Sequence, residues 1–264
     1  MRLALDHLTV GDAAPWHLVE IAAEAGYEAC CLFLQSMAVL PRLPTYDLIG
    51  DGAQRRQTKS VLAETGVILD LAYPFTLTRR SSAGDFQAGL EAAADLGARA
   101  VNLLSYDRDQ ARAADQLEQV ATLAKALGMV SVLEFYPRSG VGSLAEAVSL
   151  VSRIDQPHLR INLDILHLYR AGEGVADIAA AAPWLGYAQL ADGPLTPPAD
   201  RDHEAASQRQ VPGAGDFDIA GFIQALPPGL GISVEAPDEA AMDLFVPGLT
   251  RAKRARQACL MAKI

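Results

Sequence analysis

The chain has 264 residues, half of them hydrophobic, and a formal net charge of -10 at pH 7. This length is sufficient for one large hydrophobic core, so we expect a single domain over residues 1–264. The strong negative charge argues against nucleic acid and anionic membranes as partners, because both are themselves negatively charged.

The sequence also lacks the features expected of an exported or membrane-spanning protein. The amino-terminal segment MRLALDHLTVGD has neither the long apolar stretch nor the small-residue cleavage site of a signal peptide. The longest apolar tract, residues 178–185, is too short to cross a bilayer. Cys30, Cys31 and Cys259 do not form the even, spaced framework that disulfide-rich secreted proteins use. We therefore expect a cytoplasmic protein without a membrane span.

Eight short segments have the composition and spacing of buried β-strands. They are residues 3–10, 27–34, 66–75, 99–105, 130–137, 159–167, 185–192 and 229–237. Alanine-rich stretches with apolar residues at helical spacing lie between most of them, at residues 15–25, 85–96, 110–127, 143–154, 175–182 and 218–226. This alternation predicts parallel βαβ units. Eight such units, without a G-x-G-x-x-G motif after the first strand, favour an α/β (β/α)₈ TIM barrel over an open doubly wound sheet.

Two longer connections follow the second and seventh predicted strands. They cover residues 35–47 and 193–217. Both are expected at the carboxyl ends of the barrel strands, which is the face where TIM-barrel enzymes carry out their chemistry. The second connection is rich in Pro, Gly and charged residues, so we predict that it forms a lid over the site.

Each of the last four predicted strands carries a polar side chain with an oxygen donor near its carboxyl end. These side chains are Glu134, Asp164, Gln189 and Glu235. Burying a carboxylate in apolar strand sequence is costly unless a cation or hydrogen bonds compensate it. An ion pair could explain any one acid, but donors on four successive strands favour a shared divalent metal. All-oxygen ligation favours Mn²⁺ or Mg²⁺ over Zn²⁺.

Together with neighbouring motifs, these residues resemble the xylose isomerase-like superfamily, in particular the branch that includes D-tagatose 3-epimerase and related sugar epimerases. The resemblance extends over essentially the whole chain. The matching positions are Glu134, the pair Asp164 and His167, Gln189 with Asp192, the R-x-x-P-G-x-G-D segment at 209–216, and Glu235. Each motif is short, and it is their order and spacing that make the match specific.

The resemblance implies roles for several of these residues. It implies a metal held by Glu134, Asp164, Gln189 and Glu235. It also implies that Glu134 and Glu235 exchange protons with a substrate carbon, and that His167 and Arg209 contact substrate oxygens. One position departs from the family, which usually has His where this chain has Gln189. An amide oxygen is a weaker donor than imidazole, so Gln189 is predicted either as a ligand or as a substrate hydrogen-bonding residue.

These expectations describe a divalent-metal-dependent isomerase or epimerase acting on a sugar or keto-sugar. Removing a proton next to a carbonyl creates an enediolate, whose charge a metal and a nearby Arg stabilise. Returning the proton to the opposite face gives epimerisation, and returning it to the neighbouring carbon gives isomerisation. Loss of a β-hydroxyl from the same intermediate gives elimination. A lyase or dehydratase is therefore the alternative prediction.

The expected partner is a small uncharged sugar or sugar-derived molecule, because no Gly-rich phosphate cradle or paired basic loop is found. A homo-oligomer is left open, since barrels of this type often pair. Phosphodiester cleavage, as on the related endonuclease IV barrel, would need a His-rich zinc cluster, whereas the motif region here contributes His167 alone. A binding module with a decayed metal site would tolerate changes at Glu134 or Glu235.

Overall fold

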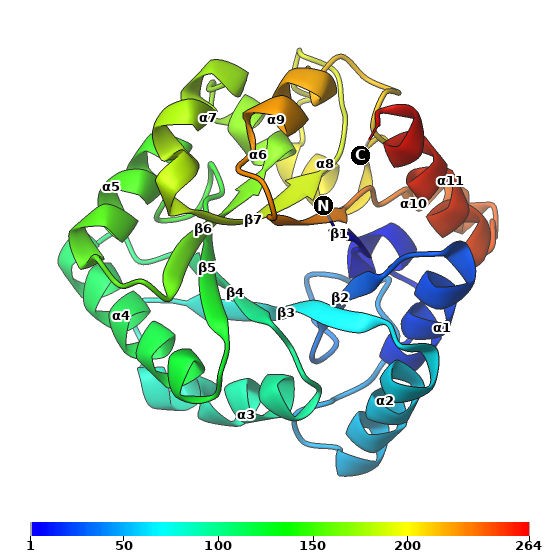
Figure 1. The fold of residues 1–264 in the computed structure, drawn as a ribbon, viewed down its shortest axis with the longest axis horizontal. Coiled ribbons are helices and arrows are strands. Elements are labelled where there is room, and N and C mark those ends of the chain that lie inside the picture. The colour runs from blue at the N-terminus through cyan, green and yellow to red at the C-terminus, as the bar shows by residue number, and fades with distance from the viewer. Residues whose placement is uncertain (1, 264) are drawn as a thin grey trace.

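The computed structural model describes residues 2–263 and places eight parallel strands in one closed barrel. Figure 1 shows the strands at the centre of the molecule and the helices around them. The order around the barrel follows the chain from β1 to β8, and β8 pairs with β1 to close it. The predicted (β/α)₈ TIM barrel is confirmed. The predicted domain, 1–264, includes two terminal residues that lie outside the described part.

The barrel strands are short and mostly buried. They are β1 (Arg2–Leu5), β2 (Ala29–Phe33), β3 (Ile68–Leu77), β4 (Ala100–Ser105), β5 (Val130–Glu134), β6 (Leu159–Asp164), β7 (Leu185–Leu190) and β8 (Gly231–Val234). In β2 all five residues, ACCLF, are buried. A parallel strand covered on both faces has a continuous apolar sequence of this kind instead of an alternating one.

The helices pack outside the strands or over their ends (Figure 1). They are α1 (Pro15–Ala25), α2 (Gly52–Thr65), α3 (Gln87–Asp95), α4 (Gln110–Ala126), α5 (Leu144–Ile154), α6 (Ile165–Arg170), α7 (Val175–Ala181), α8 (Arg201–Ser207), α9 (Ile219–Ala225), α10 (Glu239–Asp243) and α11 (Gly248–Met261). Short 3₁₀ segments are η1 (His7–Val10), η2 (Ala83–Phe86) and η3 (Ala182–Trp184). Helix α1 ends at Gly26, whose φ of 86° lies in the left-handed region that glycine adopts without strain.

Several strands end earlier than the sequence predicted, and at β1 and β6 a helical turn replaces the predicted end of the strand. The segments 3–10 and 159–167 were expected to be continuous strands, but β1 ends at Leu5 and β6 at Asp164. In both cases an Asp accepts hydrogen bonds from backbone N–H groups that follow it. Asp6 accepts from Leu8, and Asp164 accepts from the N–H groups of Leu166 and His167. Such side-chain caps start a helix, so His167 lies on α6 and not on a strand.

Helix α2 was not predicted, and its composition explains why. Of its 14 residues, GAQRRQTKSVLAET, Thr58 and Leu62 are buried. A helix that buries so little has no broad apolar stripe to reveal it in the sequence. Its amino terminus is capped by Asp51, whose side chain accepts hydrogen bonds from the N–H groups of Ala53 and Gln54.

The segment 193–217, predicted as a lid, contains helix α8 and is attached to the barrel at several points. The carboxylate of Asp192 accepts hydrogen bonds from the backbone N–H groups of Gly193, Gly213 and Phe217. The guanidinium of Arg170 on α6 pairs with Glu204 on α8 at 2.5 Å, and both side chains are buried. These contacts position the segment over the carboxyl ends of β6 and β7.

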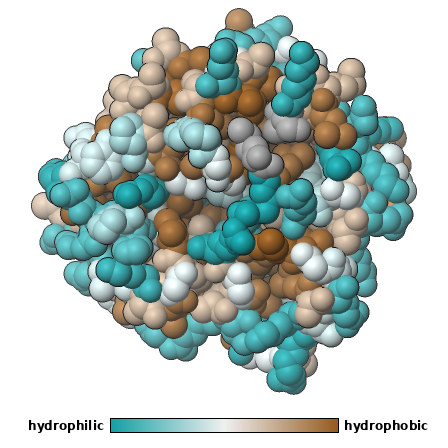
Figure 2. Space-filling view, in the orientation of Figure 1, coloured by the Kyte–Doolittle hydropathy of each residue, from teal (hydrophilic) through white to brown (hydrophobic). Residues whose placement is uncertain are grey.

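The surface combines hydrophilic and hydrophobic side chains. Figure 2 shows hydrophilic side chains over much of the periphery of one face, with smaller hydrophobic areas between them. None of the helices within residues 2–263 is long and apolar enough to cross a membrane.

His7 is a buried imidazole whose two ring nitrogens have different partners. Nε2 lies 3.0 Å from the carbonyl oxygen of Ala13, and Nδ1 accepts the backbone N–H of Phe33 at 3.1 Å. Burial lowers the pKa of His7 to about 4. A protonated ring would place a second N–H against the N–H of Phe33, so the neutral form is the one that fits.

This arrangement predicts a pH dependence of folding. The folded pKa lies below the usual value of about 6.5, so the stability contribution is lost as pH falls from about 6.5 towards 4, by about 3 kcal/mol at most. His7→Gln, whose amide can both donate and accept, should show a smaller loss. Urea unfolding of both proteins at several pH values checks this. Parallel pH profiles for the two proteins would contradict it.

Candidate active site and metal centre

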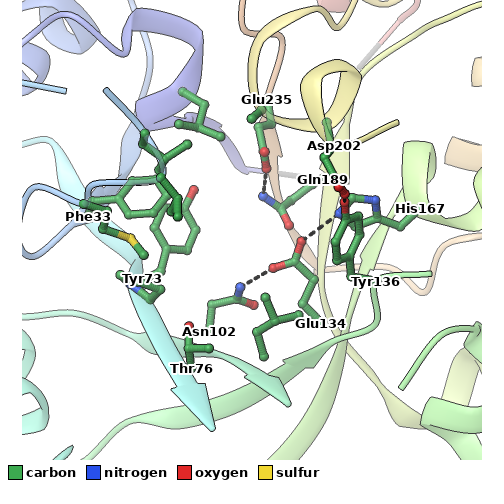
Figure 3. Close-up of a pocket in the computed structure, with 18 of the residues that line it drawn as sticks. Phe33, Tyr73, Thr76, Asn102, Glu134, Tyr136, His167, Gln189, Asp202 and Glu235 are labelled. Atoms are coloured by element: carbon green, nitrogen blue, oxygen red, sulfur yellow. Dashed lines mark hydrogen bonds and ion pairs between the residues drawn. The ribbon is translucent and has the colours of Figure 1, made fainter. Parts of the chain in front are cut away.

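A pocket of about 800 Å³ opens at the carboxyl ends of the barrel strands. Its lining includes Glu134 at the end of β5, Gln189 on β7 and Glu235, which directly follows β8. His167 on α6 also lines it. Figure 3 shows these four side chains gathered on one side of the pocket.

The structure brings together all six residues that the sequence singled out. Asp164 pairs in register with Gln189, which places these two side chains on adjacent strands at the same level. His167 Nε2 lies 3.2 Å from Glu134 Oε1 and 3.8 Å from Asp164 Oδ2. Arg209 and Glu235, which pair with each other, complete the group.

Arg209 is buried between two of the predicted metal ligands. Its Nη1 lies 2.5 Å from Asp164 Oδ2, and its Nη2 lies 2.8 Å from Glu235 Oε1. Arg209 Nε also donates to the carbonyl oxygen of Ala205 on α8, so the segment 193–217 supplies this guanidinium to the site. In the described structure a protein cation therefore bridges two carboxylates that are expected to hold a metal.

The pKa values at this centre reflect an excess of buried carboxylates. Burial raises the pKa of Glu235 well above its ordinary range, and the charges of Asp6, Asp164 and Glu134 add to the effect, whereas Arg209 opposes it. Burial also raises the pKa of Asp6 to about 7, against a hydrogen bond from Tyr73 that lowers it. Asp164 is the exception: burial opposes the shift, but Arg209 and His167 lower its pKa.

A chain of three amide side chains joins the two glutamates across the barrel. Asn162 on β6 donates to Asn102 Oδ1 at 3.0 Å and also to Gln189 Oε1. Asn102 in turn donates to Glu134, and Gln189 donates to Glu235. Figure 3 shows the two outer contacts of this chain as dashed lines. Each glutamate thus accepts a hydrogen bond from an amide side chain, and Asn162 fixes the orientation of both amides.

Sequence reasoning missed Asn162. Asn162 lies two residues before Asp164 on the same strand, so both side chains point to the same side of the sheet. This parity was the available signal. A polar residue inside the apolar run LRINLD indicates a buried hydrogen-bonding role, although the partners depend on register with β5 and β7.

Removing the centre of this chain should destabilise the protein. We expect Asn162→Ala to lower the free energy of unfolding by about 2–4 kcal/mol, because two buried amide oxygens lose their donor and a small cavity is left. Ser131→Ala is the matched control, since Ser131 is equally buried on β5 and its hydroxyl has no hydrogen-bond partner. Urea denaturation of both variants makes the comparison. Equal losses would contradict a bonding role for Asn162.

The donor set fits a divalent cation. Glu134, Asp164 and His167 each offer a ligand atom, and these atoms lie within 4.8 Å of one another. This group contains two of the predicted ligands and adds an imidazole. Arg209 pairs with Asp164 and Glu235, whereas Glu134 is contacted by the imidazole of His167 and Asp6 by the hydroxyl of Tyr73. A second cation would relieve this excess of negative charge.

The match to a family model agrees with this geometry. Residues 19–263 match the model described as "Xylose isomerase-like TIM barrel". The chain belongs to this family. The match runs from within α1 to the end of α11 and includes every predicted site residue. No curated protein gives a significant sequence match to the chain.

Solved structures of other proteins share the fold at low sequence identity. An IolI protein with a bound zinc atom has a TM-score of 0.78 at 17% identity, over 99% of this chain and 98% of that one. D-allulose 3-epimerase from Methylomonas sp. has a TM-score of 0.73 at 16% identity, over 99% and 98%. The probable 3-DHS dehydratase AsbF from Bacillus anthracis has a TM-score of 0.71 at 16% identity, over 98% and 99%.

One similar structure is much longer than this chain. A xylose isomerase-like TIM barrel/4-hydroxyphenylpyruvate dioxygenase fusion protein has a TM-score of 0.81 at 20% identity. The alignment covers 99% of this chain but 42% of the fusion protein. At these identities the similarities show the family fold, whereas substrates and reactions are specific to each protein.

Proposed function

We propose that this protein is a divalent-metal-dependent isomerase or epimerase of a sugar or keto-sugar. The observation that carries the proposal is the pair Glu134 and Glu235, two carboxylates from β5 and the end of β8 that line one pocket and are held by the same amide chain. A sugar epimerase among the similar structures supports the same reaction class.

The proposed metal ligands are Glu134, Asp164, Gln189 and Glu235. The oxygen of Gln189 already accepts a hydrogen bond from Asn162, so ligation would use its second lone pair. Hard oxygen donors favour Mn²⁺ or Mg²⁺, whereas His167 as a ligand would widen the choice to Zn²⁺. When bound, the cation would stabilise negative charge on the substrate oxygens.

The side chains of the chain itself supply the proton transfers. One glutamate removes the proton next to the substrate carbonyl, and the other returns a proton to the same carbon from the other side. Arg209, positioned by Asp164 and Glu235, contributes positive charge where the enediolate develops. His167 next to Glu134 is placed to hydrogen-bond a substrate hydroxyl or carbonyl oxygen.

A second candidate function is elimination on the same scaffold. The raised pKa of Glu235, caused first by burial, favours its protonated form, and a protonated carboxyl can donate to a departing β-hydroxyl. The similarity to a probable dehydratase supports this alternative. An epimerase or isomerase leaves the elemental composition of the substrate unchanged, whereas elimination releases water and gives an unsaturated product.

Elemental analysis of the purified protein, followed by exchange in heavy water, tests the proposal. We expect a stoichiometric divalent metal and incorporation of deuterium at one carbon of a ketose, read by NMR. Product mass distinguishes rearrangement from loss of water. A protein that binds no metal after reconstitution and exchanges no carbon-bound proton would overturn the proposal and favour a binding module.

A further inference from the structure

The pocket has a second side whose chemistry differs from that of the carboxylates. Its apolar wall consists of Leu8, Phe33, Met37, Leu40, Tyr73 and Pro74. Figure 3 shows Phe33 and Tyr73 across the pocket from Glu134, Gln189 and Glu235. The wall is formed by η1, the end of β2, the middle of β3, and the long connection that follows β2.

This wall offers little hydrogen bonding to a ligand. Its six side chains carry one hydroxyl, that of Tyr73, and this hydroxyl donates to the buried carboxylate of Asp6. The rings of Phe33 and Tyr73 lie 4.5 Å apart between centroids at an angle of 51°, so they present aromatic surface to the pocket. A sugar hydroxyl placed against this wall would lose its water partners without gaining others.

The charges near the pocket mouth also limit what this side can bind. Arg138 lines the pocket, but its Nε lies 3.2 Å from Asp202 Oδ2 and its side chain is largely exposed. Arg209 is held between Asp164 and Glu235. Both guanidinium groups are thus already paired with carboxylates, so neither is a free partner for a phosphate or carboxylate on a ligand at the apolar wall.

The pocket is larger than a free sugar bound at its polar end would fill. A pocket of about 800 Å³ is in the range that holds a drug-sized molecule, whereas a free hexose has only about a dozen heavy atoms. The polar donors and acceptors lie together at one end, so a free sugar bound there would leave the apolar side filled with water. Displacing that water with an apolar group of the ligand is favourable, because apolar surface is then removed from water.

We propose that the substrate is an uncharged sugar derivative that carries an aromatic substituent. This inference rests on the proposed function, in which the sugar lies at Glu134, His167 and Glu235. The substituent occupies the apolar wall, where Phe33 and Tyr73 give edge-to-face or offset ring contacts and Met37 adds a sulfur–aromatic contact. The wall is then a specificity-determining surface, separate from the groups that move protons.

Matched pairs of phenyl and methyl glycosides of glucose, galactose and xylose test the proposal by titration calorimetry. For at least one sugar we expect the phenyl compound to bind about tenfold tighter or more, which corresponds to burying one aromatic ring. Met37→Thr, at a half-buried position on a loop, should lower the affinity for the phenyl compound more than the affinity for the methyl compound. Leu244→Ser is the control, because Leu244 is 78% exposed and does not line the pocket.

Equal affinities within every pair, or a phenyl preference that survives both Met37→Thr and Leu40→Thr, would overturn this inference. Deuterium exchange on simple ketoses separates its failure from that of the proposed function. Exchange without any phenyl preference leaves the epimerase or isomerase proposal intact and removes the aromatic substituent. A phenyl preference without exchange on any simple or phenyl-substituted ketose supports the wall assignment and removes the proposed reaction.

Discussion

Replacing Glu235 with glutamine is expected to lower the rate of epimerisation by about 10²–10⁴-fold, the usual contribution of a general acid–base group. The amide keeps the size and shape of the side chain but cannot accept and return a proton. In a two-base reaction, the remaining Glu134 still removes the proton of one epimer. Glu235→Gln should therefore retain deuterium exchange with one epimer and lose it with the other, and Glu134→Gln should show the reverse.

NMR of each purified epimer in heavy water measures exchange and interconversion together. Glu20→Gln is the matched control, because it makes the same charge change at an exposed position on α1. One variant could lose exchange with both epimers while the other keeps exchange with both. That result would show that a single base acts, which indicates isomerisation. Full activity in both variants would exclude the assigned acid–base pair.

The sequence predicted the barrel because its strands and helices alternate with clear local signals. Apolar runs such as ACCLF in β2 and glycines such as Gly26 after α1 are local features that need no tertiary information. The strand-end carboxylates were predictable for a related reason. Parallel strands bring their carboxyl ends to one rim, so Glu134 and Glu235 line the same pocket although they are far apart in the chain.

What the sequence did not reveal depends on contacts between distant elements. The guanidinium of Arg209 reaches Asp164 only because α8 and its flanking segment are attached to α6 through Glu204 and Arg170. The position of His167 required knowing that Asp164 caps a helix and does not continue the strand. These contacts result from packing and helix capping, and residue periodicity in the sequence does not predict them.

Replacing Arg209 should make the free energy of unfolding depend most strongly on a bound divalent cation. Arg209→Met leaves Asp164 and Glu235 buried without their bridging cation, and breaking a buried pair in this way typically costs about 3–5 kcal/mol. We expect a loss of this size in the presence of a chelator. A divalent cation binding at the same carboxylates should restore much of it, because it replaces the missing positive charge and binds the folded state selectively.

Urea unfolding with a chelator and with excess Mn²⁺ measures this effect in the wild type and the variant. Lys59→Met is the control, since Lys59 pairs with Asp95 at 2.6 Å but the two side chains are 53% and 44% exposed, and such surface pairs contribute about 0–1 kcal/mol. Metal should stabilise Arg209→Met more than it stabilises the wild type, where Arg209 and the metal share the same oxygens. If Mn²⁺ stabilises both equally, the metal binds elsewhere and Arg209 is a permanent structural cation of the site.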